Sequence, residues 1–176
     1  MESERRMRKP KNSVYREAHR LPGIVFLFVL CALPAAVRAQ APADFSGMWK
    51  QDNERSQPKR NSDVKLHIEQ RDPELTVETT IAHGSRHALQ KYSTDGKVAI
   101  TTGADGDEFH TSIVWAGQSL VFSIEEHEDG RILNSKETWT LRENGTVLER
   151  VREFLDAPPG VAAKQTLIYL RETPQP

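Results

Sequence analysis

Apolar and polar residues alternate along most of the chain from residue 64 onward. Val64, Leu66 and Ile68, for example, are separated by single polar residues. A period of two is typical of a β-strand that buries one face, and no window has the 3.6-residue period of an amphipathic helix of ordinary length. The pattern predicts ten strands, at residues 45–51, 64–69, 75–81, 87–92, 97–102, 108–115, 119–127, 131–141, 146–154 and 163–172.

Turn-forming residues separate the predicted strands at regular intervals. Pairs such as Asp95-Gly96 and Asn144-Gly145 suit the positive φ angles of tight hairpins. We therefore expect strands that are neighbours in the sequence to pair, including 87–92 with 97–102. The polar residues 52–63 are expected to form a loop outside the core.

A sheet of so many twisted strands tends to curl or close, which removes its exposed edges. The sequence therefore predicts an all-β fold, an antiparallel up-and-down barrel of eight to ten strands. In this barrel the first strand, at residues 45–51, lies beside the last, at residues 163–172. A sandwich of two sheets is the structural alternative.

Several stretches carry a family resemblance. Gly47-Met48-Trp49 resembles the Gly-x-Trp opening of lipocalins and of the wider calycin group. Residues 66–80, 92–97 and 137–146 resemble hairpins of the small exported lipocalin-like proteins of bacteria. The resemblance covers nearly all of the chain after residue 44. It implies a barrel similar to those of lipocalins and fatty-acid-binding proteins.

The resemblance also implies how one end of the barrel closes. In calycins the tryptophan of the first strand usually packs under an arginine near the last strand. By position, the matching closure residues are Gly47, Trp49 and Arg171, with Arg152 as the alternative to Arg171. Fatty-acid-binding barrels insert two helices after the first strand, and residues 52–63 are too few for both.

Residues 1–39 have the pattern of a signal peptide. A basic segment precedes an apolar segment at residues 24–33, and small residues end at Ala39. This order predicts export with cleavage after Ala39. A short tether at residues 40–44 and a single lipocalin-like barrel domain at residues 45–173 would follow.

An uncleaved membrane anchor over residues 21–37 is the alternative, although Pro22, Gly23 and Pro34 interrupt it. Cleavage would leave a secreted or periplasmic protein without stable membrane insertion, and we expect a monomer. Residues 1–39 hold eight Lys/Arg and three Asp/Glu, which leaves 16 Lys/Arg and 22 Asp/Glu in residues 40–176. That acidic balance argues against a nucleic-acid partner, whose phosphates require a basic surface.

Cysteine and histidine positions limit the chemistry. The one cysteine, Cys31, lies in the leader, so the mature chain has neither a disulfide nor a thiol nucleophile. His83 and His87 have the spacing of a helical metal pair, but Gly84 and the strand that follows disfavour a helix. We therefore expect no metal site and no cofactor.

Large residues on the inward strand faces are the candidates for ligand binding. They are Phe109, Ile113, Trp115, Phe122, Trp139, Tyr169 and Arg171. Small-molecule sites are concave and mostly apolar, with a few polar groups. The alternative is that these side chains simply fill a narrow barrel. Tyr169 and Arg171 share a strand face and are candidates to anchor a carboxylate, unless Arg171 closes the barrel over Trp49.

No catalytic residue is predicted, because no serine or acid stands in a recognisable nucleophile motif. The sequence favours an exported lipocalin-like protein that binds or carries a small apolar or amphipathic ligand. The alternative is a non-enzymatic barrel that engages a protein or envelope partner through its exterior or loops, without a ligand cavity. An esterase or isomerase is a third, less favoured hypothesis.

Overall fold

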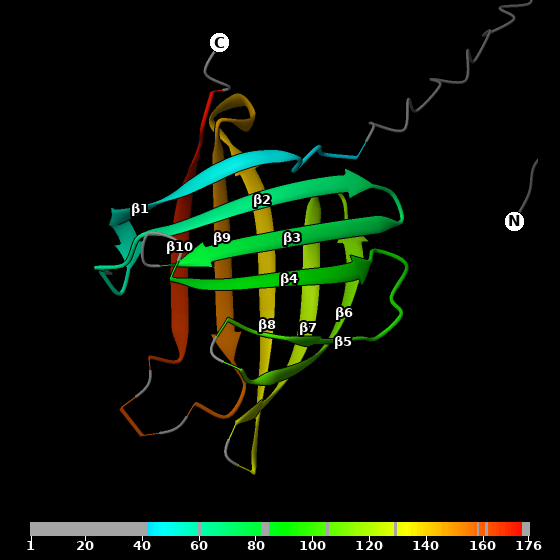
Figure 1. Ribbon diagram of the computed structural model, residues 1–176, viewed down its shortest axis with the longest axis vertical. Coiled ribbons are helices and arrows are strands. Elements are labelled where there is room, and N and C mark those ends of the chain that lie inside the picture. The colour runs from blue at the N-terminus through cyan, green and yellow to red at the C-terminus, as the bar shows by residue number, and fades with distance from the viewer. Residues whose placement is uncertain are drawn as a thin grey trace, which may run out of the picture. The chain divides into compact units, whose positions relative to one another are not determined.

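One antiparallel β-sheet curls into a nearly closed barrel in the computed structural model of the protein (Figure 1). The structure describes residues 42–59, 61–81, 85–104, 106–128, 130–157, 159–160 and 162–173. These residues belong to one compact unit, Ala39–Pro176. The predicted signal peptide at residues 1–39 lies outside the described residues. Within the described part of the chain, no helix has the length and apolar character needed to cross a membrane.

The ten strands follow one another along the chain with short connections. They are β1 (Gly47–Gln57), β2 (Val64–Arg71), β3 (Glu74–Ile81), β4 (Arg86–Ser93), β5 (Ala99–Thr102), β6 (Glu108–Ala116), β7 (Ser119–Glu128), β8 (Arg131–Arg142), β9 (Val147–Phe154) and β10 (Lys164–Arg171), with a 3₁₀ turn η1 (Glu143–Gly145) before β9. Their order in the sheet is β4-β3-β2-β1-β10-β9-β8-β7-β6-β5. The predicted antiparallel up-and-down barrel is therefore confirmed.

The pairing of β1 with β10 joins the two ends of the chain. Trp49 lies opposite Arg171 in this ladder, and the register becomes irregular between Asp52 and Gln57. The prediction of a loop over residues 52–63 is wrong in its first half, because β1 continues to Gln57. Ser56 allows this polar segment to stay in the sheet. Its hydroxyl donates to the Asp52 carbonyl oxygen at 2.6 Å and accepts from the backbone N–H of Ile168 at 3.1 Å.

The sheet is not hydrogen-bonded between β4 and β5, which are its two edges. The predicted hairpin between residues 87–92 and 97–102 is therefore wrong. Gly96 has the expected positive φ of 86°, but its N–H donates to the Ile113 carbonyl oxygen of β6 at 2.9 Å. The turn is thus hydrogen-bonded to β6, and it does not pair β5 with β4. A side-chain hydrogen bond of 3.4 Å from Gln90 to Thr101 spans the gap.

Aromatic side chains fill the end of the barrel where β1 begins, which we call the closed end. Phe45 and Trp49 are fully buried there. The indole N–H of Trp49 donates to the Phe45 carbonyl oxygen at 2.9 Å. The Phe45 ring lies 6.1 Å from that of Trp115 and 6.2 Å from that of Trp139, between ring centroids. This packing places the solid part of the core at one end and leaves room beyond it.

The opposite end, which we call the far end, is formed by the connections that follow β1, β3, β5, β7 and β9. The connection between β1 and β2 spans residues 58–63, and its described residues hold no helix. This agrees with the expectation that residues 52–63 cannot form the two helices of a fatty-acid-binding barrel.

Candidate functional site

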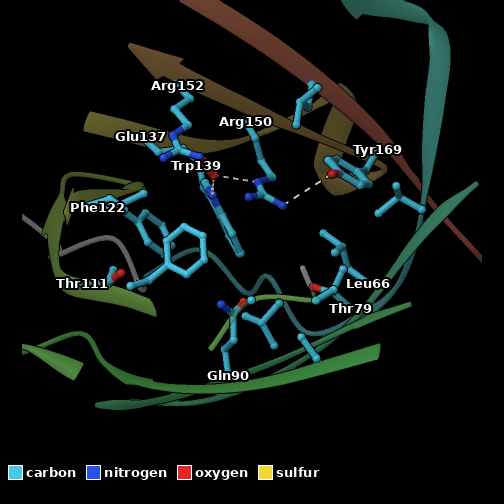
Figure 2. Close-up of a pocket in the computed structure, with 18 of the residues that line it drawn as sticks. Leu66, Thr79, Gln90, Thr111, Phe122, Glu137, Trp139, Arg150, Arg152 and Tyr169 are labelled. Atoms are coloured by element: carbon cyan, nitrogen blue, oxygen red, sulfur yellow. Dashed lines mark hydrogen bonds and ion pairs between the residues drawn. The ribbon is translucent and has the colours of Figure 1, made fainter. Parts of the chain in front are cut away.

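A cavity of about 430 Å³ lies inside the barrel (Figure 2). Its wall includes apolar residues from β2 and β3, such as Leu66 and Val77, and aromatic residues from β6, β7, β8 and β10. Ser62, Gly103 and Ala104 also line it, so the cavity reaches the far end. Ligand sites typically measure about 300–1,000 Å³, so this cavity suits a small ligand.

Three aromatic rings form a continuous apolar surface in the cavity. Phe122 packs on Trp139 with 4.6 Å between ring centroids. The Tyr92 ring packs edge-on against the Phe122 ring, with 6.2 Å between ring centroids. Burial raises the pKa of Tyr92 to about 12, so its phenol is neutral at physiological pH. These rings provide a surface for the apolar part of a ligand.

An ion pair between Glu137 of β8 and Arg150 of β9 lies in the cavity wall (Figure 2). Arg150 Nε donates to Glu137 Oε1 at 2.7 Å, and the indole N–H of Trp139 donates to the same oxygen. The guanidinium also lies 4.7 Å from the centroid of the Trp139 ring and donates to the Tyr169 hydroxyl at 3.4 Å. Burial opposes ionisation of Glu137. The Arg150 charge and the two donors outweigh burial and hold the pKa of Glu137 below its ordinary value.

A second ion pair lies beside the first, because Arg152 follows Arg150 by two residues on the inner face of β9. Arg152 Nη2 donates to Glu126 Oε2 at 2.5 Å, and its Nε donates to Ser135 Oγ at 2.9 Å. Each interior arginine therefore already has a carboxylate partner. The two pairs together leave the cavity with no net charge.

The other wall offers neutral polar groups. Thr79 and Gln90 face the ion pairs across the cavity (Figure 2). Gln51 of β1 also lines the cavity, and its buried Nε2 has no hydrogen-bond partner among the described residues. A buried amide donor without a partner is costly. A ligand oxygen would give it one.

The structure brings together only part of the predicted ligand-binding set. Phe109, Phe122, Trp139 and Tyr169 line the cavity. Three others lie outside its wall. Ile113 is fully buried in the core, Trp115 packs against Phe45 at the closed end, and Arg171 lies over Trp49.

Tyr169 and Arg171 do not form a carboxylate anchor, because the two side chains have different partners. The Tyr169 hydroxyl accepts a hydrogen bond from Arg150 Nη1. Arg171 lies two residues further along β10, which places it beyond the cavity at the closed end. Its guanidinium carbon is 4.2 Å from the centroid of the Trp49 ring. Nη2 and Nε donate to the carbonyl oxygens of Asp44 and Gly145 at 3.1 and 2.8 Å.

Gly47 belongs to the same closure. Its φ is +127°, and a Cβ at this position would lie 2.9 Å from Arg171 Nη1. Arg171 Nη1 donates to the carbonyl oxygen of the preceding residue, Ser46. Only glycine therefore combines this backbone conformation with the close approach of the guanidinium.

The polar half of the cavity was missed by the sequence analysis. Its members are Gln51, Glu137, Arg150 and Arg152, and Glu126 is the ion-pair partner of Arg152 behind them. A signal was present on β9, where Arg150 and Arg152 alternate in phase with Leu148 and Phe154. Charged residues on the apolar face of a strand indicate either paired charges inside the barrel or a register error.

Comparison with known proteins supports the fold. Neither protein-family models nor curated proteins gave a match to the chain. Among solved structures, the chain is similar to the REP1-NXSQ fatty acid transporter, with a TM-score of 0.57 at 12% identity over 75% of this chain and 98% of the other. Secretory abundant heat soluble protein 4 from Ramazzottius varieornatus gives 0.57 at 13% identity, over 76% and 99%. Fatty-acid-binding protein 1 of Echinococcus granulosus gives 0.55 at 11%, over 73% and 98%. The expected barrel of the lipocalin and fatty-acid-binding type is confirmed.

Proposed function

We propose that this protein binds and carries a small amphipathic molecule inside its barrel. The observation that carries the proposal is the cavity of about 430 Å³ with an aromatic surface and a paired polar wall. Similar barrels include a protein described as a fatty acid transporter and one described as a fatty-acid-binding protein. The alternative of a barrel without a cavity does not fit this interior. A carrier role is favoured over catalysis because the interior acids and arginines are paired with one another.

We further propose that the polar end of the ligand is uncharged. A carboxylate at Arg150 would either displace Glu137 and leave its charge buried without a partner, or lie beside Glu137 as a second buried negative charge. Breaking a buried ion pair costs about 3–5 kcal/mol. A hydroxyl, ester or amide avoids this cost and accepts a hydrogen bond from Gln51 Nε2, the unpaired donor in the wall. A long-chain alcohol or a neutral ester of glycerol has this chemistry.

The binding proposal is tested by filling the cavity. Thr79 lines the cavity, whereas the next residue, Thr80, points to the outside of β3. Thr79→Trp is expected to reduce binding of a neutral apolar fluorescent probe at least tenfold. The matched control, Thr80→Trp, is expected to bind like the unmodified protein. Thermal unfolding of both variants would show whether each retains its fold. Unchanged binding by a folded Thr79→Trp variant would contradict binding in this cavity.

The head-group proposal needs two competitors with the same alkyl chain. A fatty alcohol and the matching fatty acid are each used to displace the probe at pH 7.5. The alcohol is expected to compete at a concentration at least tenfold lower. If the acid competes better while Thr79→Trp still abolishes binding, the cavity is a binding site but its ligand is anionic.

We also propose that residues 1–39 are a signal peptide and that the barrel acts in a secreted or periplasmic location. The basic segment, the apolar segment and the small residues that end at Ala39 support this. The test is the intact mass and N-terminal sequence of the protein from its own host. A chain that begins at Gln40 in the exported fraction is expected. A full-length chain held in the membrane fraction would favour the anchor.

A further inference from the structure

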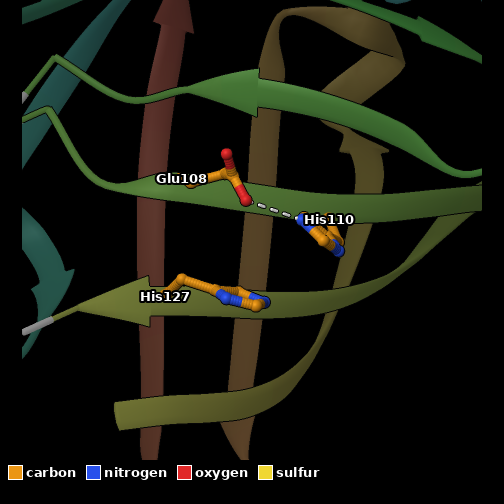
Figure 3. A group of neighbouring side chains, drawn as sticks. All are labelled: Glu108, His110 and His127. Atoms are coloured by element: carbon orange, nitrogen blue, oxygen red, sulfur yellow. Dashed lines mark hydrogen bonds and ion pairs between the residues drawn. The ribbon is translucent and has the colours of Figure 1, made fainter. Parts of the chain in front are cut away.

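A cluster of metal-ligand side chains lies on the outer face of the barrel, away from the cavity (Figure 3). Glu108 and His110 are two residues apart on β6 and so share a face. His127 of β7 lies directly opposite Glu108 in the ladder. Phe109, which lies between Glu108 and His110 on β6, lines the cavity on the other side of the sheet. The three candidate side chains therefore form a triangle across two hydrogen-bonded strands.

The ligand atoms of this cluster already lie close together. One carboxylate oxygen and one nitrogen from each imidazole all lie within 4.8 Å of one another. The two rings stack with 4.4 Å between their centroids. His110 Nε2 is 2.8 Å from Glu108 Oε1. Zinc–nitrogen bonds of about 2.0–2.1 Å place tetrahedral ligand atoms about 3.4 Å apart. Binding therefore requires the two stacked rings to turn until a nitrogen lone pair of each points at the same ion.

His127 supplies a second, independent observation. Its Nε2 is buried and has no hydrogen-bond partner among the described residues. Buried ring nitrogens normally have a partner, and an unsatisfied one lowers stability. A metal ion would satisfy this nitrogen.

We propose that Glu108, His110 and His127 bind one divalent transition-metal ion of the Zn²⁺ type. Two imidazole nitrogens and one carboxylate oxygen suit zinc, copper or nickel, whereas calcium and magnesium prefer oxygen ligands throughout. The outer face leaves the fourth position to water. Glu125 Oε2 lies 4.0 Å from His110 Nδ1, beyond hydrogen-bond distance, and its negative charge adds to the attraction of the site for a cation.

A second group of histidines on the outer face provides the contrast. Glu78 lies between His67 and His87, with an oxygen 3.3 Å from His67 Nδ1 and another 2.7 Å from His87 Nε2. Here the carboxylate already has both imidazoles as partners. The hydrogen bonds to His87 and His67 hold the pKa of Glu78 below its ordinary value. This group is a matched control, because it has the same residue types on the same kind of surface.

The experiment is calorimetric titration of the tag-free protein with zinc chloride, together with the visible absorption spectrum in Co²⁺. The unmodified protein and His87→Gln are expected to bind one ion per chain. His127→Gln and Glu108→Gln are expected to weaken binding at least tenfold and to lose the Co²⁺ bands of a low-symmetry site. Thermal unfolding without metal shows that each variant is folded.

Two results would overturn the proposal. One is no zinc binding by the unmodified protein. The other is a loss of binding in His87→Gln with no loss in folded His127→Gln and Glu108→Gln. Thr79→Trp is expected to keep its zinc affinity, because the cavity and the cluster lie on opposite faces of the sheet.

Discussion

Glu137 and Arg150 determine the electrostatic character of the cavity, because each is the other's main partner away from bulk water. Their side chains are 5% and 20% exposed. The pair makes the cavity neutral while keeping two charged groups inside it. Substitution of one member therefore changes both the stability and the ligand preference of the barrel.

We expect Glu137→Gln to lower the free energy of unfolding by roughly 2–3 kcal/mol. Breaking a buried ion pair typically costs about 3–5 kcal/mol of stability. The expected loss is smaller because glutamine keeps a hydrogen-bond acceptor for Arg150. The freed Arg150 charge should raise fatty-acid affinity at least tenfold. Urea denaturation and probe displacement measure the two effects.

The matched control for that substitution is Glu149→Gln. Glu149 is partly exposed and forms an outer-face ion pair with the exposed Arg142 at 2.8 Å. An exposed pair contributes about 0–1 kcal/mol. Equal effects of the two substitutions on stability and fatty-acid affinity would contradict the role given to Glu137.

The pKa of Glu137 also predicts a pH dependence. Because the folded pKa is below the ordinary 4.5, ionised Glu137 stabilises the fold above pH 4.5. That contribution is lost as the pH falls from 4.5 through the folded pKa. We expect stability to decline over this acid range, and the decline to be shallower in Glu137→Gln. Denaturation curves from pH 7 to 3 measure this difference, and identical pH profiles would contradict it.

At the scale of strands, alternation was the strongest signal in the sequence. It predicted the strands from β2 to β10, because each buries one face, and the expected closure of the sheet predicted the pairing of β1 with β10. It failed for residues 52–57, where the sheet continues through polar residues. There the Ser56 hydroxyl makes hydrogen bonds to the backbone of Asp52 and Ile168. It also failed at Asp95-Gly96. Turn residues specify a local backbone conformation, and they do not specify which strand comes next to it.

The same limit applies to the sites. The aromatic wall of the cavity followed from strand faces, since Phe109, Phe122 and Trp139 point inward. The Glu137–Arg150 pair required the register between β8 and β9, which no local pattern gives. The outer Glu108–His127 contact likewise depends on the β6–β7 register. Sequence therefore predicts faces well, whereas contacts between faces on different strands come from the fold.

The start of β1 provides a prediction at this scale. Gly47→Ala should destabilise the barrel by more than Gly117→Ala. Both positions have positive φ, but only at Gly47 would a Cβ meet another group, Arg171 Nη1 at 2.9 Å. The φ penalties differ, because Gly117 at +64° lies in the left-handed region, where alanine costs about 1 kcal/mol, whereas Gly47 at +127° lies outside that region. The excess measured by urea denaturation therefore combines the less favourable φ at Gly47 with the displacement of Arg171 from Trp49. Equal losses would show that the closure tolerates the added methyl group.

At the scale of the whole molecule, the barrel is a continuous ladder with one interruption. The edges β4 and β5 lack a strand partner on one side. Local opening is easiest where hydrogen bonds are fewest. We expect backbone amides of residues 86–93 and 99–102 to exchange with deuterium faster than those of residues 164–171. Peptide-level hydrogen exchange measures this, and uniform protection around the barrel would contradict it.

The short connection between β1 and β2 has a consequence for the residence time of a bound guest. It spans only residues 58–63, too few for the two helices of a fatty-acid-binding barrel, so escape at this point of the far end does not require such helices to move. Dissociation in stopped-flow experiments should then follow a single exponential with a small activation enthalpy. The residence time would depend on how strongly the aromatic wall binds the ligand, which makes this barrel suited to rapid release of the ligand to an acceptor.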